Sequence, residues 1–246
     1  MMNTVLEAKN LYKSYGEKKV IADISVRLGR GEIVALLGVS GIGKTTLFNL
    51  LSGLERPDSG SVHLNGEDVT GKSGLVGYMQ QSDLLLPFKS IADNAALPLV
   101  LRGEKRKVAR ERVISMLKDF GLEGCEKLYP AQLSGGMRQR AALLRSCLFS
   151  SEALLMDEPF SALDAITRSD MQRWFKAVAR KQGLSVFFIT HDINEALLLS
   201  DRIYILGGAP GRISHELNNI LPEGEMPELT EEFLNNKIRI TKLISQ

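Results

Sequence analysis

Hydrophobic residues in this chain gather into short runs separated by longer amphipathic stretches. Four of the runs have the length and apolar character of buried parallel strands. They cover residues 32–38, 152–157, 185–190 and 202–206. Two stripes at helical spacing lie between them, one of Leu47, Leu50, Leu51 and Leu54 and one of Met171, Trp174, Phe175 and Val178. The alternation of strand and helix patterns predicts an α/β fold built on a parallel sheet.

Two segments depart from this alternation. Residues 61–69 alternate apolar and polar positions around Asn65-Gly66, a dipeptide typical of a two-residue hairpin, and so predict an N-terminal antiparallel β element. From about residue 82 to residue 150, strand patterns are replaced by helical ones. The apolar faces expected there contain Val113, Leu117 and Phe120, and Met137, Ala141, Leu144 and Leu148. These residues predict a helical insertion into the α/β core.

We expect one domain over residues 1–246, since the sequence contains no internal repeat. Residues 1–81 and 150–215 are predicted to form the α/β core, and residues 82–149 the inserted helical subdomain. The segment after residue 207 is rich in glycine, proline and charged residues, and the chain ends in a short amphipathic stretch. Residues 216–246 are therefore predicted to be a short C-terminal tail.

Composition narrows the classes of function. Of 246 residues, 44% are hydrophobic, while 31 basic residues against 29 acidic ones leave a formal charge of +2 and no broad field for nucleic acid. Cys125 and Cys147 stand apart without a CxxC motif, which predicts two reduced thiols in an intracellular protein. The first residues lack the pattern of a secretory signal, and the apolar runs are too short to span a bilayer, so any membrane role is expected to be peripheral.

One motif carries specific chemistry. The segment "GVSGIGKTT" (residues 38–46) fits G-x-x-x-x-G-K-[ST] directly after an apolar strand and before an apolar-striped helix. Glycines let backbone N–H groups approach phosphates, Lys44 is suited to the β- and γ-phosphate oxygens, and the Thr45 hydroxyl to Mg²⁺. The alternative is a glycine-rich turn that merely precedes a helix. The predicted nucleotide contacts are Gly38, Ser40, Gly41, Gly43, Lys44, Thr45 and Thr46.

Two adjacent acids end the apolar run at residues 152–157. Asp157 and Glu158 stand where side chains at the carboxyl edge of a parallel sheet project toward a ligand. Asp157 is predicted to hold the Mg²⁺ shell, and Glu158 to deprotonate the attacking water. Without the phosphate loop, the same pair reads as a solvated helix cap.

Three further residues are candidates through their positions. His191 follows the run at 185–190, where it either contacts the γ-phosphate and the attacking water or simply closes the strand before a helix near Asp192. Gln81 stands where the β core passes into the helical insertion, and its amide can ligate a metal and contact water. The Tyr15 ring either stacks on a nucleotide base or packs within an N-terminal strand.

Together these residues resemble the ATP-binding subunits of ABC transporters. The resemblance extends over nearly the whole chain. It rests on the phosphate loop, Gln81, the signature "LSGGMRQR" (133–140), "LLMDEP", the "SALD" loop ending at Asp164, and "THD" with His191. Within the family, the segments "SDLLLPF" and "LSDRIYILGGAPGRI" resemble the bacterial nitrate, sulfonate and taurine importer branch, which includes importers of thiamine-related pyrimidines. The resemblance implies a P-loop NTPase (RecA-like) core with ATP and Mg²⁺ as its ligands.

Some positions depart from the family pattern. Gln80 stands where an apolar or aromatic residue commonly precedes the loop glutamine, and Gln81 is chosen because its spacing to Pro87 matches the family. Phe88 replaces a frequent tryptophan on the surface expected to meet the membrane partner. Val39 and Ile42 replace small or polar residues of the phosphate loop, but both still contribute backbone N–H groups.

The resemblance also implies a homodimer that sandwiches two nucleotides. Ser134, Gly135 and Gly136 of one copy then contact the γ-phosphate held by the phosphate loop of the other, and Asp164 acts at the same interface. Ser134 is also expected to cap the helix that carries Met137 and Ala141, a role compatible with the first.

The expected activity is hydrolysis of ATP to ADP and phosphate, coupled to solute uptake. The family pattern implies a subunit at the cytoplasmic face of the membrane, docked through residues 82–101 onto a separate permease and served indirectly by an extracytoplasmic binding protein. A soluble ABC-type ATPase acting on nucleic acid or protein complexes is the alternative, with the basic stretch at 102–112 as its main support. A module that binds ATP without hydrolysis is disfavoured because Glu158 and His191 are both present.

Overall fold

The computed structural model describes residues 4–150, 152–219 and 227–244. Its strands are β1 (Thr4–Tyr15), β2 (Lys18–Gly29), β3 (Ile33–Leu37), β4 (Ser59–Leu64), β5 (Glu67–Asp68), β6 (Gly77–Met79), β7 (Leu154–Asp157), β8 (Val186–Thr190), β9 (Arg202–Gly207) and β10 (Arg212–Asn218). Its α-helices are α1 (Lys44–Leu51), α2 (Ile91–Leu101), α3 (Arg106–Leu117), α4 (Gly135–Phe149), α5 (Ala165–Gln182), α6 (Ile193–Leu199) and α7 (Glu231–Ile244). Two 3₁₀ turns, η1 (Pro130–Gln132) and η2 (Pro227–Leu229), complete the elements.

The strands form two sheets. The larger has the order β10-β9-β3-β8-β7-β6 and is parallel except for β10, which pairs with β9 in the antiparallel sense. The smaller is antiparallel with the order β2-β1-β4-β5. A parallel bridge between Ile21 and Gly211 joins the edges of the two sheets. The α/β core and the N-terminal antiparallel element predicted from the sequence are confirmed.

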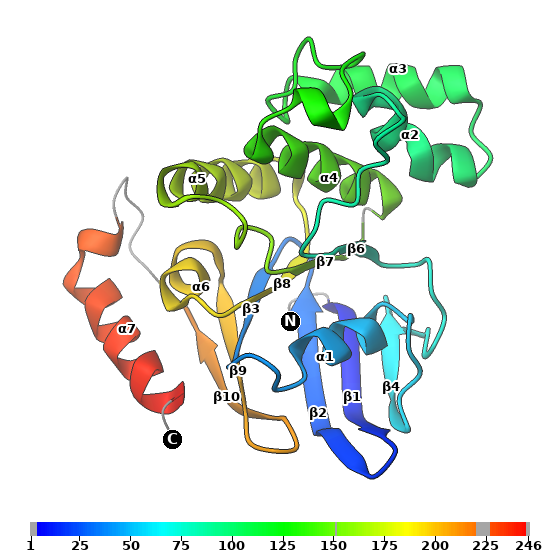
Figure 1. Ribbon diagram of the computed structural model, residues 1–246. Helices are drawn as coiled ribbons and strands as arrows, with labels where there is room; N and C mark the ends of the chain where they lie inside the picture. The colour runs from blue at the N-terminus through cyan, green and yellow to red at the C-terminus, as the bar shows by residue number, and fades with distance from the viewer. Residues whose placement is uncertain (1–3, 151, 220–226, 245–246) are drawn as a thin grey trace.

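The larger sheet separates two hydrophobic clusters. All five residues of β3 are buried, with Ile33, Ala35 and Leu37 on one face and Val34 and Leu36 on the other. This two-sided burial explains why the strand reads as a continuous apolar run and does not alternate. The first face packs against α5, α6 and the helical subdomain, while the second packs against α1 and the smaller sheet (Figure 1).

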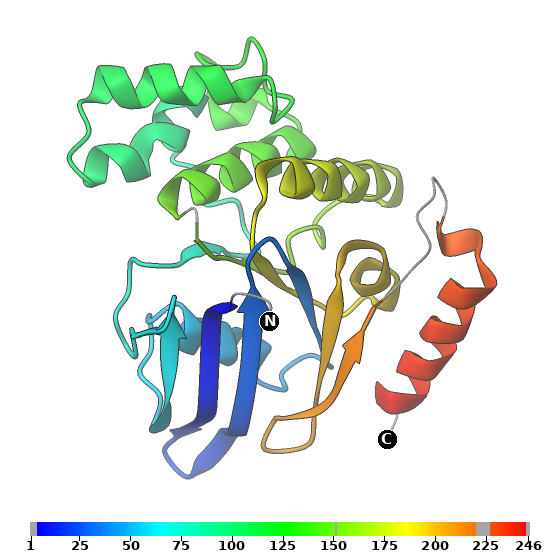
Figure 2. The same ribbon diagram turned by 180° about the vertical axis from the view of Figure 1, so that it is seen from behind.

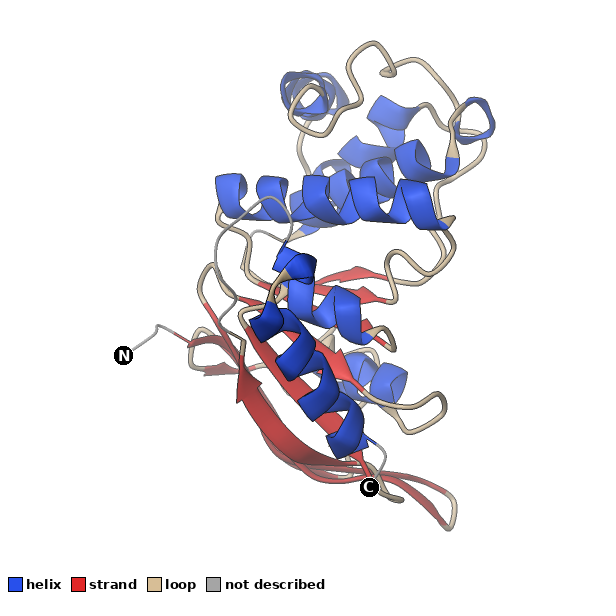
Figure 3. Cartoon of the chain, turned by 90° about the vertical axis from the view of Figure 1, so that its left-hand side faces the viewer, coloured by secondary structure: helices blue, strands red, loops and turns tan. Residues whose placement is uncertain are grey.

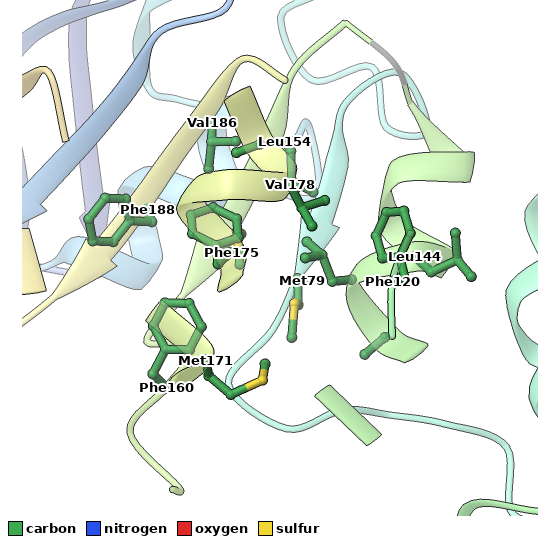
Figure 4. Packing of buried hydrophobic residues seen from close by; sticks show 14 of the residues in the cluster. Met79, Phe120, Leu144, Leu154, Phe160, Met171, Phe175, Val178, Val186 and Phe188 are labelled. Carbon is green, nitrogen blue, oxygen red and sulfur yellow. The ribbon is translucent and has the colours of Figure 1, made fainter. Parts of the chain in front are cut away.

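The helical subdomain of α2, α3 and α4 lies over one end of the sheets, as Figures 2 and 3 show from two further sides. Helix α5 lies between this subdomain and the larger sheet, and its apolar stripe enters the shared core. Figure 4 shows Phe175 and Val178 of α5 near Phe188 of β8 and Leu154 of β7, and Met171 of the same helix beside Phe160. The continuous core ties the inserted helices to the sheet.

Most predicted elements are present, with local differences. Leu47, Leu50 and Leu51 are buried on α1, but Leu54 lies beyond its end and is 57% exposed, so its place in that stripe was wrong. The hairpin turn is confirmed, with positive φ values at Asn65 and Gly66 as a type I′ turn requires. Cys125 and Cys147 are free thiols.

The C-terminal region packs more closely than a tail. The predicted boundary at residue 215 falls inside β10, while Phe233 and Ile240 of α7 are buried in the core cluster. Part of the glycine- and proline-rich segment, residues 220–226, lies outside the described residues. Helix α7 therefore lies against α6 and the larger sheet as part of the folded unit.

Candidate active site

The phosphate-loop motif connects β3 to α1. Its glycines adopt conformations that other residues rarely reach, with φ of 77° at Gly41 and 112° at Gly43. A Cβ at Gly43 would lie 3.1 Å from Val20 Cγ1. Because Gly43 caps α1 without a side-chain hydrogen bond, the first N–H groups of this helix are available to an anion.

Lys44 lies buried inside the loop. Its ammonium donates hydrogen bonds to the backbone carbonyls of Gly38 at 2.9 Å and Val39 at 3.0 Å. Burial lowers the pKa of Lys44, while the negative charges of Glu158 and Asp157 act in the opposite direction. A cation held this way, inside a loop of backbone amides, fits the phosphates of a nucleotide.

Thr45 and Asp157 meet across the sheet edge although 112 positions separate them in the sequence. The Thr45 hydroxyl donates to Asp157 Oδ2 at 2.9 Å. Burial raises the pKa of Asp157, opposed by this hydrogen bond and by the Lys44 charge. In the part of the chain that the structure describes, no group of three or more acidic, histidine or cysteine side chains forms a metal cage. One carboxylate and one hydroxyl fit Mg²⁺, which takes its remaining ligands from phosphate and water.

Glu158 follows β7 with a φ of 45°, an unusual conformation for a residue with a side chain. Its carboxylate lies 3.2 Å from Nδ1 of His191, which follows the neighbouring strand β8. A cavity of about 430 Å³ joins these two residues to Gly38, Val39 and Ser40 of the phosphate loop. The predicted acid, histidine and phosphate loop therefore share one site.

Gln81 lies on the Glu158 side of its loop. Its amide donates to the Ser161 hydroxyl at 3.3 Å, and that hydroxyl donates to the backbone carbonyl of Glu158 at 3.0 Å. Gln80 instead lines a separate groove beside α2 and α4. Of the two glutamines, Gln81 is the one connected to the catalytic loop.

Tyr15 ends β1 close to the start of α1. Its hydroxyl donates to the Glu55 carboxylate, and its side chain interacts with Thr46. Burial and the Glu55 hydrogen bond raise its pKa, the Thr46 contact lowering it. Because the hydroxyl is engaged and 47% of the residue is exposed, the ring presents a face beside the phosphate loop.

The signature residues lie elsewhere. Ser134 caps α4 by accepting a hydrogen bond from the Met137 N–H at 3.3 Å. A Cβ on Gly135 would lie 3.7 Å from the Leu163 side chain, next to Asp164, which caps α5 by accepting from the Thr167 N–H at 3.1 Å. Hydrogen bonding by Thr167 lowers the pKa of Asp164. The structure brings Ser134, Gly135, Gly136 and Asp164 together, but none of them lines the cavity beside the phosphate loop.

Two features of the site have no counterpart in the sequence analysis. Ile244, near the C-terminal end of α7, lines the 430 Å³ cavity. Arg168 and Glu195 face a second, smaller cavity next to Glu158 and His191. The sequence offered one signal for this second cavity, the acid Glu195 within the apolar segment "INEALLL". A buried charge requires a specific environment.

Comparison with known proteins agrees with this geometry. Residues 21–161 match the ABC transporter family model. The formylaminopyrimidine import ATP-binding protein ThiZ of Halalkalibacterium halodurans is 47% identical over 78% of this chain and 74% of its own length. The taurine import ATP-binding protein TauB of Escherichia coli O157:H7 is 41% identical over 87% and 84%, respectively.

Solved structures give the same result. The dimeric structure of MJ0796, a bacterial ABC transporter cassette, superposes with a TM-score of 0.74 at 28% identity, over 87% of this chain and 99% of the other. A second MJ0796 structure, a dimeric post-hydrolysis state bound to ADP and phosphate, matches equally well. With its phosphate loop, acidic strand end and signature helix in the arrangement described above, this chain belongs to the ABC transporter family.

Proposed function

We propose that this chain is the ATP-hydrolysing, energy-coupling subunit of an importer. The observation that carries the proposal is the shared cavity in which the phosphate loop, Glu158 and His191 meet. The names of the import ATP-binding relatives ThiZ and TauB support the transport role. Their two different solutes, formylaminopyrimidine and taurine, leave the solute class open.

In this proposal the phosphate loop binds ATP through its backbone amides and Lys44. Thr45 and Asp157, with Gln81, hold Mg²⁺, which when bound neutralises phosphate charge and orients the phosphate oxygens. The Tyr15 ring stacks on the base, and Ser40 and Thr46 add contacts to the phosphates. The hydrogen bond between Thr45 and Asp157 and the buried Lys44 inside the loop support these roles.

Glu158 acts as the general base. Its carboxylate accepts a proton from the water that attacks the γ-phosphate, and ADP leaves as the β–γ bond breaks. His191, whose Nδ1 lies 3.2 Å from the Glu158 carboxylate, keeps that carboxylate in position beside the phosphate loop. Gln81, through Ser161, links the same loop to the helical subdomain.

A second copy of the chain completes the site. The cavity beside their own phosphate loop is not lined by Ser134, Gly135, Gly136 or Asp164, which supports a role toward the nucleotide of the partner. The dimeric MJ0796 cassettes support a homodimer of this kind. Hydrolysis then depends on closure of two subunits.

A groove beside α2 and α4 supports docking on a permease. It measures about 330 Å³ and is lined by Leu97, Pro98 and Leu101 of α2, by Phe149 of α4 and by Gln80. Leu101 and, nearby in sequence, Phe88 are highly exposed, at 76% and 71%. No helix among the described residues is both long and apolar enough to cross a bilayer. The names of the import ATP-binding relatives support our proposal that the subunit lies at the cytoplasmic face of the membrane, with a binding protein acting on the permease from the other side.

The alternative of a nucleic-acid ATPase finds little support in the basic stretch at 102–112. Arg106 and Arg110 pair with Asp93, and Arg112 pairs with Glu104. Three of its cations thus share two carboxylates within the subdomain. Nucleic acid is not among the partners we propose.

Glu158→Gln tests the proposed catalysis. The amide preserves the size of the side chain and its contact with His191 but cannot accept the proton, so turnover should fall by about 10²- to 10⁴-fold. ATP binding should persist, and a nucleotide-dependent dimer should accumulate. The assays are phosphate release, equilibrium nucleotide binding and light scattering. Near-normal phosphate release would remove Glu158 as the base.

A further inference from the structure

A small cavity lies behind the catalytic residues, separate from the one that opens onto the phosphate loop. Its volume is about 40 Å³, and its walls come from the loop after β7, from α5 and from the start of α6. Its lining includes Glu158 and His191 together with Arg168 and Glu195. The cavity has room for about one water molecule.

Two residues that line this cavity each have a buried polar atom without a partner, and the two atoms are of opposite character. Arg168 Nε, a donor, and Glu195 Oε1, an acceptor, are both shielded from solvent and have no hydrogen-bond partner. No ion pair within 4.0 Å joins the two side chains, and Glu195 is only 6% exposed. Leaving a buried donor and acceptor unpaired costs about 1–3 kcal/mol for each group. A water that accepts from Arg168 and donates to Glu195 satisfies both.

Each side chain is also attached to a functional loop. Arg168 Nη2 donates to the Leu163 carbonyl at 2.7 Å and thereby holds the residue before Asp164. Glu195 Oε2 accepts from the Thr190 hydroxyl at 2.6 Å, and that hydroxyl accepts from the Asp192 N–H at 3.0 Å. The residues on both sides of His191 are therefore held by Glu195.

We propose that Arg168 and Glu195 are positioning residues for hydrolysis, joined by a water in this cavity. The link connects the loop of Asp164, at the predicted dimer interface, with the loop of His191, at the site of water attack. It extends the proposed function, on which it rests, by giving a physical route from the position of the Asp164 loop to the imidazole. Neither residue touches the reacting atoms.

Loss of the link has a specific kinetic consequence. Without it, His191 and Asp164 keep their own caps and contacts, so nucleotide binding by the phosphate loop is unchanged while the geometry at Glu158 loosens. Misplacement of a catalytic group by about 1 Å costs up to about 100-fold in rate. We therefore expect Arg168→Gln to lower kcat by about 10- to 100-fold and to change the KM for ATP less than about twofold.

The kinetic test compares four variants of the full chain. Arg173→Gln is the matched control, because Arg173 lies on the same helix, pairs with Asp170 and is exposed to solvent. Glu195→Gln should lower kcat as Arg168→Gln does, and the double variant should be little worse than either single one. Multiplied effects in the double variant, or an equal loss in Arg173→Gln, would overturn the link.

A second test reads His191 directly and needs no hydrolysis. The chain has three histidines, so the imidazole signals of His191, His63 and His215 can be assigned by NMR. Arg168→Gln should shift the His191 signals in the nucleotide-free protein and leave the other two in place. Unchanged His191 signals contradict the proposal even if the protein hydrolyses ATP, whereas shifted signals support it even if the protein does not. A crystal structure should show a water bonded to both side chains.

Discussion

Glu195→Gln is expected to change how the stability of the protein depends on pH. Burial raises the pKa of the Glu195 carboxyl to about 7 from its usual value of 4.5. The Thr190 hydrogen bond and the charges of Arg168 and His191 lower this pKa, while the charge of Asp192 raises it. Between these two pKa values, the folded state binds more protons than the unfolded state. Stability of the native protein therefore falls as pH rises through this window.

The magnitude follows from the two pKa values. The loss of folding stability caused by ionisation of Glu195 is nearly complete above pH 7 and small below pH 4.5. Between pH 5 and pH 8 this loss grows by about 2.5 kcal/mol, at 1.36 kcal/mol per pKa unit. Glutamine has no proton to lose, and its amide oxygen can still accept from Thr190. The free energy of unfolding of Glu195→Gln, relative to that of the native protein, should thus rise by about 2.5 kcal/mol from pH 5 to pH 8.

Urea unfolding of both proteins at pH 5, 6.5 and 8 measures this difference. The other ionisable groups are the same in the two proteins. The pH dependence of the difference between their free energies of unfolding therefore reports on residue 195. Glu228→Gln, an exposed site on η2, is a suitable control and should show no trend. A stability difference that stays constant from pH 5 to pH 8 would refute the reasoning.

Three further outcomes are expected. Ser134→Arg should abolish hydrolysis and leave ATP affinity of the monomer unchanged, measured by nucleotide titration at low protein concentration; a large loss of affinity would contradict the cross-subunit role. Leu101→Glu should weaken co-purification with a permease expressed from neighbouring genes, while Leu229→Glu, at 77% exposure on η2, should not. Glu32→Ala removes the bidentate partner of buried Arg202, at 2.8 and 2.9 Å, and should cost about 3–5 kcal/mol in urea unfolding, whereas an effect below 1 kcal/mol would show that Glu216 compensates.

The parallel strands and the phosphate loop were predictable because their signals are local. A strand buried on both faces must be apolar throughout, and a loop that wraps phosphate must have glycine where φ is positive. Both constraints act over fewer than ten residues. The same holds for the Asn65-Gly66 turn and for the caps at Ser134 and Asp164, whose side chains bond to N–H groups three residues on.

The bounds and the pairing of strands β1 and β2 were not predicted, although each strand has 12 residues. Register shifts interrupt their pairing, including one between Ala8 and Leu11 around Asn10, which has a φ of 47°. Such bulges break the period-two alternation that identifies a strand.

The sequence by itself determined the family of this protein and which acid follows which strand, and it predicted the residues that we propose to bind phosphate. Tertiary structure alone decided which of these residues meet. Strand order in the larger sheet brings Thr45 to Asp157 and His191 to Glu158. The packing of α5 and α6 on that sheet gives Arg168 and Glu195 a shared cavity. These distances join residues far apart in sequence, and no local pattern encodes them, because they are set by the packing of the entire core.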